Sequence, residues 1–200
     1  MAMTLGRVLA GEKLLHLAGE IQMGLLPKKF PLFPSASNAD VYATIVPALE
    51  VGGDFYHYFL LDSNHLCFVI RDVSDKGIPA ALFMAMTLTA FVVFAKDVGR
   101  TLPESIGLLN QYLCDNNQSQ MFVTLYAGMV ALRTGVLEYC DGGHEPPFLS
   151  TSSCELLCDA VMKRLGQFVH GAPQSDDITV LAVSYRGHAE SECLERAKSA

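Results

Sequence analysis

Hydrophobic residues recur at helical spacing in some blocks of the chain and as short strand-like runs in others. Apolar positions three and four residues apart, with proline and glycine at the ends, predict helices over 11–26, from after Gly77 to about Lys96, over 103–114 and over 154–170. Apolar runs bounded by glycine, proline or polar residues predict strands over 41–47, 66–70, 121–131, 136–140 and 178–185. This order of elements predicts a mixed α+β fold.

The first predicted helix carries a continuous apolar stripe and ends at Pro27. The stripe consists of Leu14, Leu17, Ala18, Ile21 and Leu25. Two interpretations remain open: the stripe packs on the body of the domain, or it forms a dimerising or signal-carrying coil.

The run from Ile78 to Ala95 has 18 residues without a charge, which just reaches the length of a membrane-spanning helix. It also contains Pro79, Thr87 and Thr89, and its flanks are polar. A helix that is apolar all round is also typical of a protein core, so we expect a buried helix and no membrane insertion.

Composition narrows the class of protein. The 200 residues fit one domain, and 21 acidic against 14 basic residues leave a net charge of −7. Without a basic stripe, nucleic-acid binding is not expected.

The six cysteines include no C-x-x-C pair, which favours a reducing cytoplasm. Cys154 and Cys158 lie four apart, as in some metal sites, but the sequence offers no second pair, so we expect them to act as small apolar residues.

Three aspartates lie at predicted strand ends: Asp54 follows two glycines, Asp72 closes the strand 66–70, and Asp176 precedes the strand 178–185. Taken singly, such aspartates are ordinary turn residues that accept backbone hydrogen bonds. Carboxylates gathered together without sulfur or imidazole groups suit Mg²⁺ or Mn²⁺. Two such ions neutralise a phosphate ester and lower the pKa of bound water, which is the chemistry of phosphate ester hydrolysis.

Five strings occur in one order along the chain: VGGDFYHYF (51–59), RDVSDKGIPAALFMA (71–85), MFVTLYAGMV (121–130), DGGHEPPFL (141–149) and QSDDITVLAV (174–183). Together they resemble the bacterial stage II sporulation protein E-like, or RsbU-like, branch of the type 2C (PPM) metal-dependent protein phosphatases. The string EIQMGLLPKKFP (20–31) resembles the helix and connector that lead into such a domain from an upstream sensor. The resemblance divides the chain into a linker helix and connector (1–30), a phosphatase-like domain (31–186) and a polar tail (187–200).

The resemblance implies a two-sheet β-sandwich flanked by helices, with a binuclear Mn²⁺ or Mg²⁺ site at one end of the sheets. It implies that Asp54 holds one metal and Asp72 bridges both, that the carbonyl of Val73 and the carboxylate of Asp176 are further ligands, and that Asp177 orients its loop. The implied substrate is a phosphorylated anti-sigma-factor antagonist. The implied location of the chain is the cytoplasm, alone or as the cytoplasmic part of a membrane-attached sensor.

The sequence also departs from the family pattern. Leu149 runs almost directly into Cys154, where the family carries a longer stretch with a further acidic metal-ligand loop, so the sandwich is expected to be shortened. Arg71 replaces a usual glycine; it either competes with a metal at Asp72 or points away along the strand edge. His57 replaces a usual acidic residue; it either weakens the site or faces solvent.

Two polar residues near the acidic loops have alternative roles. Lys76 either steers the phosphate or is a surface residue of a glycine loop, and His144 is either a catalytic acid or a brace for its turn.

These observations support three hypotheses. The first is a phosphoserine/phosphothreonine protein phosphatase that activates water with two metals. The second is a phosphatase-derived binding or dimerisation module that has lost a metal ligand and acts through the N-terminal stripe. The third, a membrane-embedded fragment, rests only on the run from Ile78 to Ala95.

Overall fold

A computed structural model describes residues 2–28, 38–97 and 99–187. Its helices and strands follow in chain order: α1 (Ala2–Leu25), β1 (Ala39–Val46), β2 (Phe55–Leu60), β3 (His65–Val73), α2 (Ile78–Ala95), α3 (Leu102–Asp115), β4 (Val123–Ala131), β5 (Leu137–Gly142), α4 (Cys154–Val169) and β6 (Ile178–Tyr185). All the predicted helices and strands are present, and β2 is an addition. Most of the predicted connector (29–37) and the tail from residue 188, with Cys193, lie outside the described residues.

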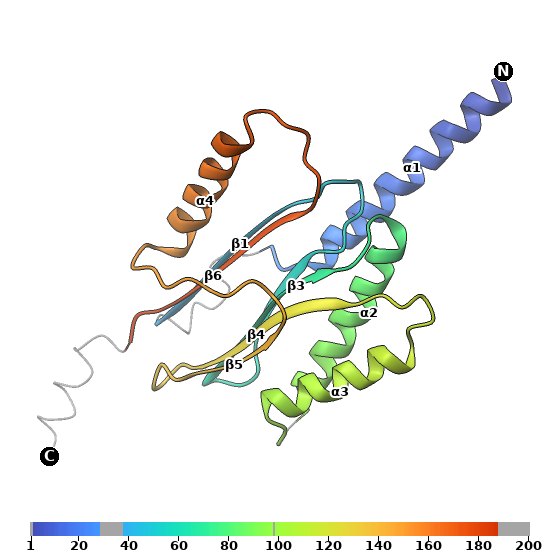
Figure 1. Cartoon of the computed structure of the whole chain (residues 1–200). Helices are drawn as coiled ribbons and strands as arrows, with labels where there is room; N and C mark the ends of the chain where they lie inside the picture. Colours follow the sequence, from blue (N-terminus) through green and yellow to red (C-terminus); the bar gives the residue numbers. More distant parts are fainter. Residues whose placement is uncertain (1, 29–37, 98, 188–200) are drawn as a thin grey trace, which may run out of the picture.

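The strands form two antiparallel sheets, one of four strands in the order β2-β3-β4-β5 and one of the two strands β1 and β6. Helix α4 packs on the β1–β6 sheet, and α2 and α3 cover the far side of the four-stranded sheet (Figure 1). The predicted two-sheet sandwich flanked by helices is confirmed. Residues 143–153, between β5 and α4, contain neither helix nor strand.

Side chains of β1 point alternately to two faces of the β1–β6 sheet, one packed against the four-stranded sheet and the other against α4. Val41 and Ala43 are 5% and 6% exposed and face the core shared with the four-stranded sheet. Tyr42 points to the other face, where it packs with Cys154 and Cys158 of α4. Both thiols donate to carbonyl oxygens of β1, so these cysteines pack as small apolar side chains and not as a metal pair.

Helix α2 is half buried. Phe83, Met84 and Phe91 are in the core, whereas Leu82 and Val93 are 68% and 60% exposed. The prediction of a helix buried on every side is therefore wrong, because α3 and the sheet cover only part of its circumference. Among the described residues, α2 is the single helix long and apolar enough to cross a membrane, and 44% of it is buried within the protein.

Helix α1 contacts the domain with a different face from the predicted stripe. Gln22 and Leu26 are buried, while Leu14, Leu17 and Ile21 are 68%, 51% and 62% exposed. The interpretation in which the stripe packs on the body of the domain is wrong. The docking face was hard to recognise because a glycine and a glutamine, and not a run of leucines, make its closest contacts.

Candidate metal centre

The three predicted aspartates lie at the same end of the sandwich. Asp54 immediately precedes β2, Asp72 is the second-last residue of β3, and Asp176 precedes β6. Because β2 and β3 are antiparallel and Phe55 pairs with Arg71, the start of β2 lies beside the end of β3. The topology therefore brings Asp54 and Asp72 together from two different strands.

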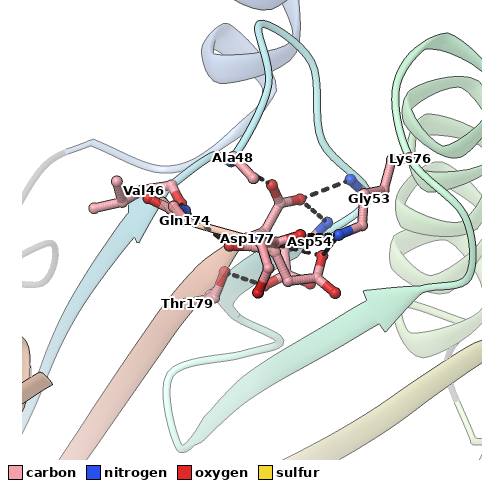
Figure 2. Close-up of polar contacts among 10 residues, drawn as sticks. Val46, Ala48, Gly53, Asp54, Lys76, Gln174, Asp177 and Thr179 are labelled. Atoms are coloured by element: carbon pink, nitrogen blue, oxygen red, sulfur yellow. Dashed lines mark hydrogen bonds and ion pairs between the residues drawn. The ribbon is translucent and has the colours of Figure 1, made fainter. Parts of the chain in front are cut away.

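The loop before β2 is organised by a carboxylate from the opposite end of the chain (Figure 2). Asp177 Oδ1 accepts a hydrogen bond from the Ala48 N–H at 2.8 Å, and Asp177 Oδ2 accepts from Gly53 and Asp54 at 2.9 and 3.2 Å. A Cβ on Gly52 would lie 2.2 Å from Asp177 Oδ2, so only glycine permits this approach. This geometry supports the predicted orienting role of Asp177.

The Asp54 carboxylate is fixed by Thr179, whose hydroxyl donates to Asp54 Oδ2 at 2.6 Å. Burial raises the pKa of Asp54 to about 7, although the Thr179 hydrogen bond opposes this and the charge of Asp72 adds to it. Burial also raises the pKa of Asp72, while the proton that Asp54 donates to it acts in the opposite direction. Two carboxyl groups this close cannot both ionise easily, and a divalent cation between them would reverse that preference.

Asp176 is exposed and paired with a cation. Lys76 Nζ lies 3.1 Å from Asp176 Oδ1 and also donates to the Ser175 carbonyl oxygen. The charge of Asp176 raises the pKa of Asp72, which shows that the two carboxylates lie within electrostatic reach. Lys76 is therefore part of the acidic end of the sandwich and not an isolated surface residue.

Gln174 fixes the backbone of the same loop. Its Nε2 donates to the carbonyl oxygens of Val46 and Asp176, both at 2.8 Å (Figure 2). Sequence reasoning missed Gln174 and Thr179 as parts of the site. Glutamine in a loop carries no local signal, whereas a threonine two positions after the aspartate pair was a recognisable candidate.

The oxygen donors present fit a hard divalent ion. A Cβ on Gly53 would lie 2.8 Å from the carbonyl oxygen of Val73, so this oxygen reaches the loop that carries Asp54. Carboxylate and carbonyl oxygens are the ligands that Mg²⁺ and Mn²⁺ prefer. Among residues 2–28, 38–97 and 99–187, however, no three His, Cys, Asp or Glu side chains converge as a group that could hold a metal ion. The structure thus pairs Asp54 with Asp72 and leaves Asp176 at the edge, engaged by Lys76.

His144 contacts its own turn and a neighbouring strand. Its ring Nδ1 lies 3.0 Å from the Thr124 hydroxyl, and its backbone N–H donates to Asp141 Oδ1 at 3.0 Å. Burial lowers the pKa of His144, and the charge of Asp72 opposes this. The bracing alternative accounts for these hydrogen bonds.

Arg71 and His57 are not placed as predicted. Arg71 lies on the opposite face of β3 from Asp72 and is 0% exposed, with its guanidinium carbon 5.0 and 4.8 Å from the ring centres of Phe55 and Phe91. It points away from the candidate site, but into the core and not along the strand edge. His57 is half buried on that same face, where burial lowers its pKa, so the alternative in which it faces solvent is wrong.

Comparisons with known proteins bear directly on the class of fold. The SiaA-PP2C domain of Pseudomonas aeruginosa superposes with a TM-score of 0.69 at 18% identity, covering 94% of this chain and 100% of that one. The fold is therefore that of the type 2C phosphatases.

Sequence matches define the branch within this class. Residues 62–156 match the family model of stage II sporulation protein E. The phosphoserine phosphatase RsbU of Bacillus subtilis is 31% identical over 158 residues, which are 76% of this chain and 44% of RsbU. Protein IcfG of Synechocystis sp. is 31% identical over 162 residues, which are 66% of this chain and 25% of IcfG. These matches confirm the predicted resemblance to the stage II sporulation protein E-like, RsbU-like branch of the type 2C phosphatases. The chain spans less than half the length of either relative.

Proposed function

We propose that the chain is a metal-dependent phosphoserine/phosphothreonine protein phosphatase. The observation that carries this proposal is the Asp54–Asp72 pair at one end of a type 2C fold, in which burial raises the pKa of both carboxyl groups and the charge of Asp72 raises that of Asp54 further. Perturbed carboxyl pairs of this kind are typical of functional sites. The match to RsbU, which is named a phosphoserine phosphatase, supports the reaction class.

Asp54, Asp72, the carbonyl of Val73 and Asp176 are the proposed ligands for two Mn²⁺ or Mg²⁺ ions. When bound, the ions supply charge neutralisation of the phosphate and activation of a water molecule. Within the chain, Thr179 and Asp177 hold Asp54 in place, the first through the carboxylate and the second through the backbone N–H. Lys76 contacts Asp176, and its ammonium group would be available to the phosphate if a divalent ion were held by that carboxylate instead.

The test is hydrolysis of p-nitrophenyl phosphate, and of a phosphorylated antagonist protein, with and without Mn²⁺. Asp72→Asn keeps the shape of the side chain and removes its charge. We expect the wild type to show Mn²⁺-dependent turnover and Asp72→Asn to lose at least about a hundredfold in rate, since one ligand to both ions is lost. Equal background rates in the two proteins would refute an active enzyme.

A small phosphorylated anti-sigma-factor antagonist is the proposed substrate, within a partner-switching system in the cytoplasm.

An upstream sensor and a second copy of the chain are the proposed partners of α1. The dimer proposal rests on the four exposed apolar side chains of one face of α1, namely Leu14, Leu17, Ile21 and Leu25. Sedimentation velocity is expected to show a concentration-dependent dimer for the wild type and a monomer for Ile21→Glu; a monomeric wild type would contradict the dimer.

The second candidate is a phosphatase-derived binding module. It is favoured by the lack of a three-carboxylate group among the described residues and by the two-stranded second sheet. Calorimetric titration with Mn²⁺ separates the candidates. Two-ion binding supports the phosphatase, and the absence of any heat of binding supports the module.

A further inference from the structure

A shallow groove lies between the first turns of α2 and the loop that joins α3 to β4 (Figure 1). Its volume is about 360 Å³, and no side chain that lines it carries a charge. On the helix side Ile78 and Leu82 are 51% and 68% exposed, whereas Phe83 and Met121 line the groove from within the core. Exposed apolar hollows of this kind are typical of surfaces that bind a partner.

The loop that forms the other wall of the groove is held by its own hydrogen bonds. Asn117 Nδ2 donates to the Met121 carbonyl oxygen at 2.5 Å, and the Met121 N–H donates to Asn117 Oδ1 at 2.8 Å. Between them, Gln118 and Ser119 are exposed, and their side chains make no hydrogen bond with other residues that the structure describes. The groove is therefore formed in advance, with polar groups at its rim that can pair with the backbone of an extended chain.

The groove adjoins the candidate metal centre through the start of β4. The Ser74 N–H donates to the Phe122 carbonyl oxygen, and the Phe122 N–H donates to Ser74 Oγ, both at 2.9 Å. Two residues further along β4, Thr124 pairs with Asp72, so Phe122 is on the same face of the sheet as Asp72. Phe122 is 66% exposed and directly follows Met121 of the groove. One strand spacing across and two residues along correspond to about 8 Å between Phe122 and Asp72.

The position of the groove suits a protein substrate better than another occupant. Asp54, Asp72 and Lys76 at the acidic end act on a phosphate group and do not distinguish the molecule that carries it. An extended chain advances about 3.3 Å per residue, so about 8 Å corresponds to two or three residues. A second copy of the chain bound in the groove would cover the acidic end, whereas a substrate must reach both places at once.

We propose that the groove binds an apolar side chain of the phosphoprotein substrate, about two or three residues from the phosphorylated serine or threonine. This inference rests on the proposed function, because it places the phosphate at the acidic end. The bound segment is extended, with its apolar side chain against Leu82 and Met121 and its backbone beside Gln118 and Ser119. These residues touch no reacting atom; they determine which phosphoproteins are hydrolysed.

Two substitutions on α2 separate docking from catalysis and from stability. Leu82→Glu places a charge in the groove at a position that is 68% exposed. Val93→Glu is the matched control, because Val93 is 60% exposed, lies about three turns further along the same helix and does not line the groove. Both variants are expected to fold, since neither side chain is buried.

The first measurement is the hydrolysis of synthetic phosphoserine peptides and of p-nitrophenyl phosphate with Mn²⁺. One peptide has alanine at every position around the phosphoserine, and the others carry a single leucine at successive positions on either side. We expect leucine about two or three positions away to raise kcat/KM by about tenfold over alanine, the effect of burying one such side chain. Leu82→Glu should lose this gain and keep the rate on p-nitrophenyl phosphate, and Val93→Glu should keep both. No preference for leucine at any position, or an equal loss in the two variants, would overturn the proposal.

The second measurement does not depend on turnover. Protein labelled at its methionine methyl groups is titrated with the unphosphorylated forms of the leucine peptides and followed by NMR. Met86 and Met121 line the groove, whereas Met162 belongs to α4. We expect the resonances of Met86 and Met121 to shift in the wild type and in Val93→Glu but not in Leu82→Glu, and that of Met162 to stay in place.

The outcomes of the titration are distinct from those of the proposed function. Unshifted resonances in the wild type would overturn the docking site. Shifts of Met86 and Met121 on concentrating the chain alone would assign the groove to a second copy and would also overturn it. If the wild type hydrolyses neither p-nitrophenyl phosphate nor any peptide while the peptides still shift these resonances, the proposed function fails and the docking site stands.

Discussion

The buried guanidinium of Arg71 gives a test of the core that does not depend on function. Its three side-chain nitrogens have no hydrogen-bond partner among the residues that the structure describes. Burial lowers the pKa of Arg71 from its ordinary value to about 9. This difference corresponds to about 5 kcal/mol against the charged side chain. The rings of Phe55 and Phe91 offset about 1 to 2 kcal/mol each through cation–π contacts.

The charged side chain therefore opposes folding by about 1 to 3 kcal/mol. Arg71→Met keeps an extended side chain between the two rings and removes the charge. We expect the free energy of unfolding to rise by about 1 to 3 kcal/mol in urea titrations near neutral pH. We expect the melting temperature to rise by about 2 to 4 °C for each kcal/mol. The control is Arg133→Met at an exposed position, which should change stability by less than about 0.5 kcal/mol.

The effect of Arg71→Met also has a defined dependence on pH. Because the pKa of Arg71 is lower in the folded than in the unfolded state, the unfolded chain holds more protons above about pH 9. The wild type is therefore stabilised relative to the variant as pH rises through about 9, and the difference between them should narrow from about pH 8 to about pH 10. A variant less stable than the wild type by 1 kcal/mol or more, or a difference independent of pH, would show that Arg71 stabilises the core and would refute this reasoning.

Two further substitutions test the site and the sheet. The pKa of Asp54 is raised from 3.8 to about 7 on folding, so the metal-free wild type loses stability as pH rises through that range. In the presence of a chelator at about pH 8, Asp54→Asn should therefore have a free energy of unfolding higher than that of the wild type by on the order of 1 kcal/mol, and the two should be equal near pH 4. A lower free energy of unfolding for the variant at pH 8 would contradict the raised pKa. At Gly128, a Cβ would lie 2.3 Å from the Phe68 ring. Gly128→Ala is expected to lower the free energy of unfolding in urea by about 1 to 3 kcal/mol, whereas Gly107→Ala, with open space around it, should not destabilise; equal stability of these two variants would contradict tight packing at Gly128.

Local patterns in the sequence predicted most of the fold. The strand over 178–185 coincides with β6, because two aspartates mark its start and a continuous apolar run its length. Strand β2 was missed since Phe55–Leu60 follows a pair of glycines and is aromatic at nearly every position, which removes the alternation that marks a strand. Side chains on both faces of β2 are buried because other elements cover both faces, and this cover depends on the whole fold and not on the local sequence.

The candidate site was predictable where the residues carry chemistry and less so where they only hold others in place. Asp54, Asp72 and Asp176 stand in recognisable motifs, and the structure places all three at one end of the sandwich. Gln22 and Gln174 act through backbone groups far away in the sequence, so no local pattern identifies them. The apolar stripe of α1 shows the same effect, because its period reveals an apolar face but not which face the domain uses.

The pairing of β1 with β6 affects the order in which parts of the protein can fold. These strands come from opposite ends of the domain, with Ala39 beside Tyr185, so their contact closes nearly the whole domain into one loop. Contacts of such long range form slowly, after local hairpins such as β2–β3 and β4–β5. During synthesis the loop of Asp54 is made early, whereas Asp177, which binds this loop, is made only just before the last strand. Maturation of the acidic end is therefore a late event, and a nascent chain interrupted before β6 carries Asp54 and Asp72 without the carboxylate that arranges the loop of Asp54.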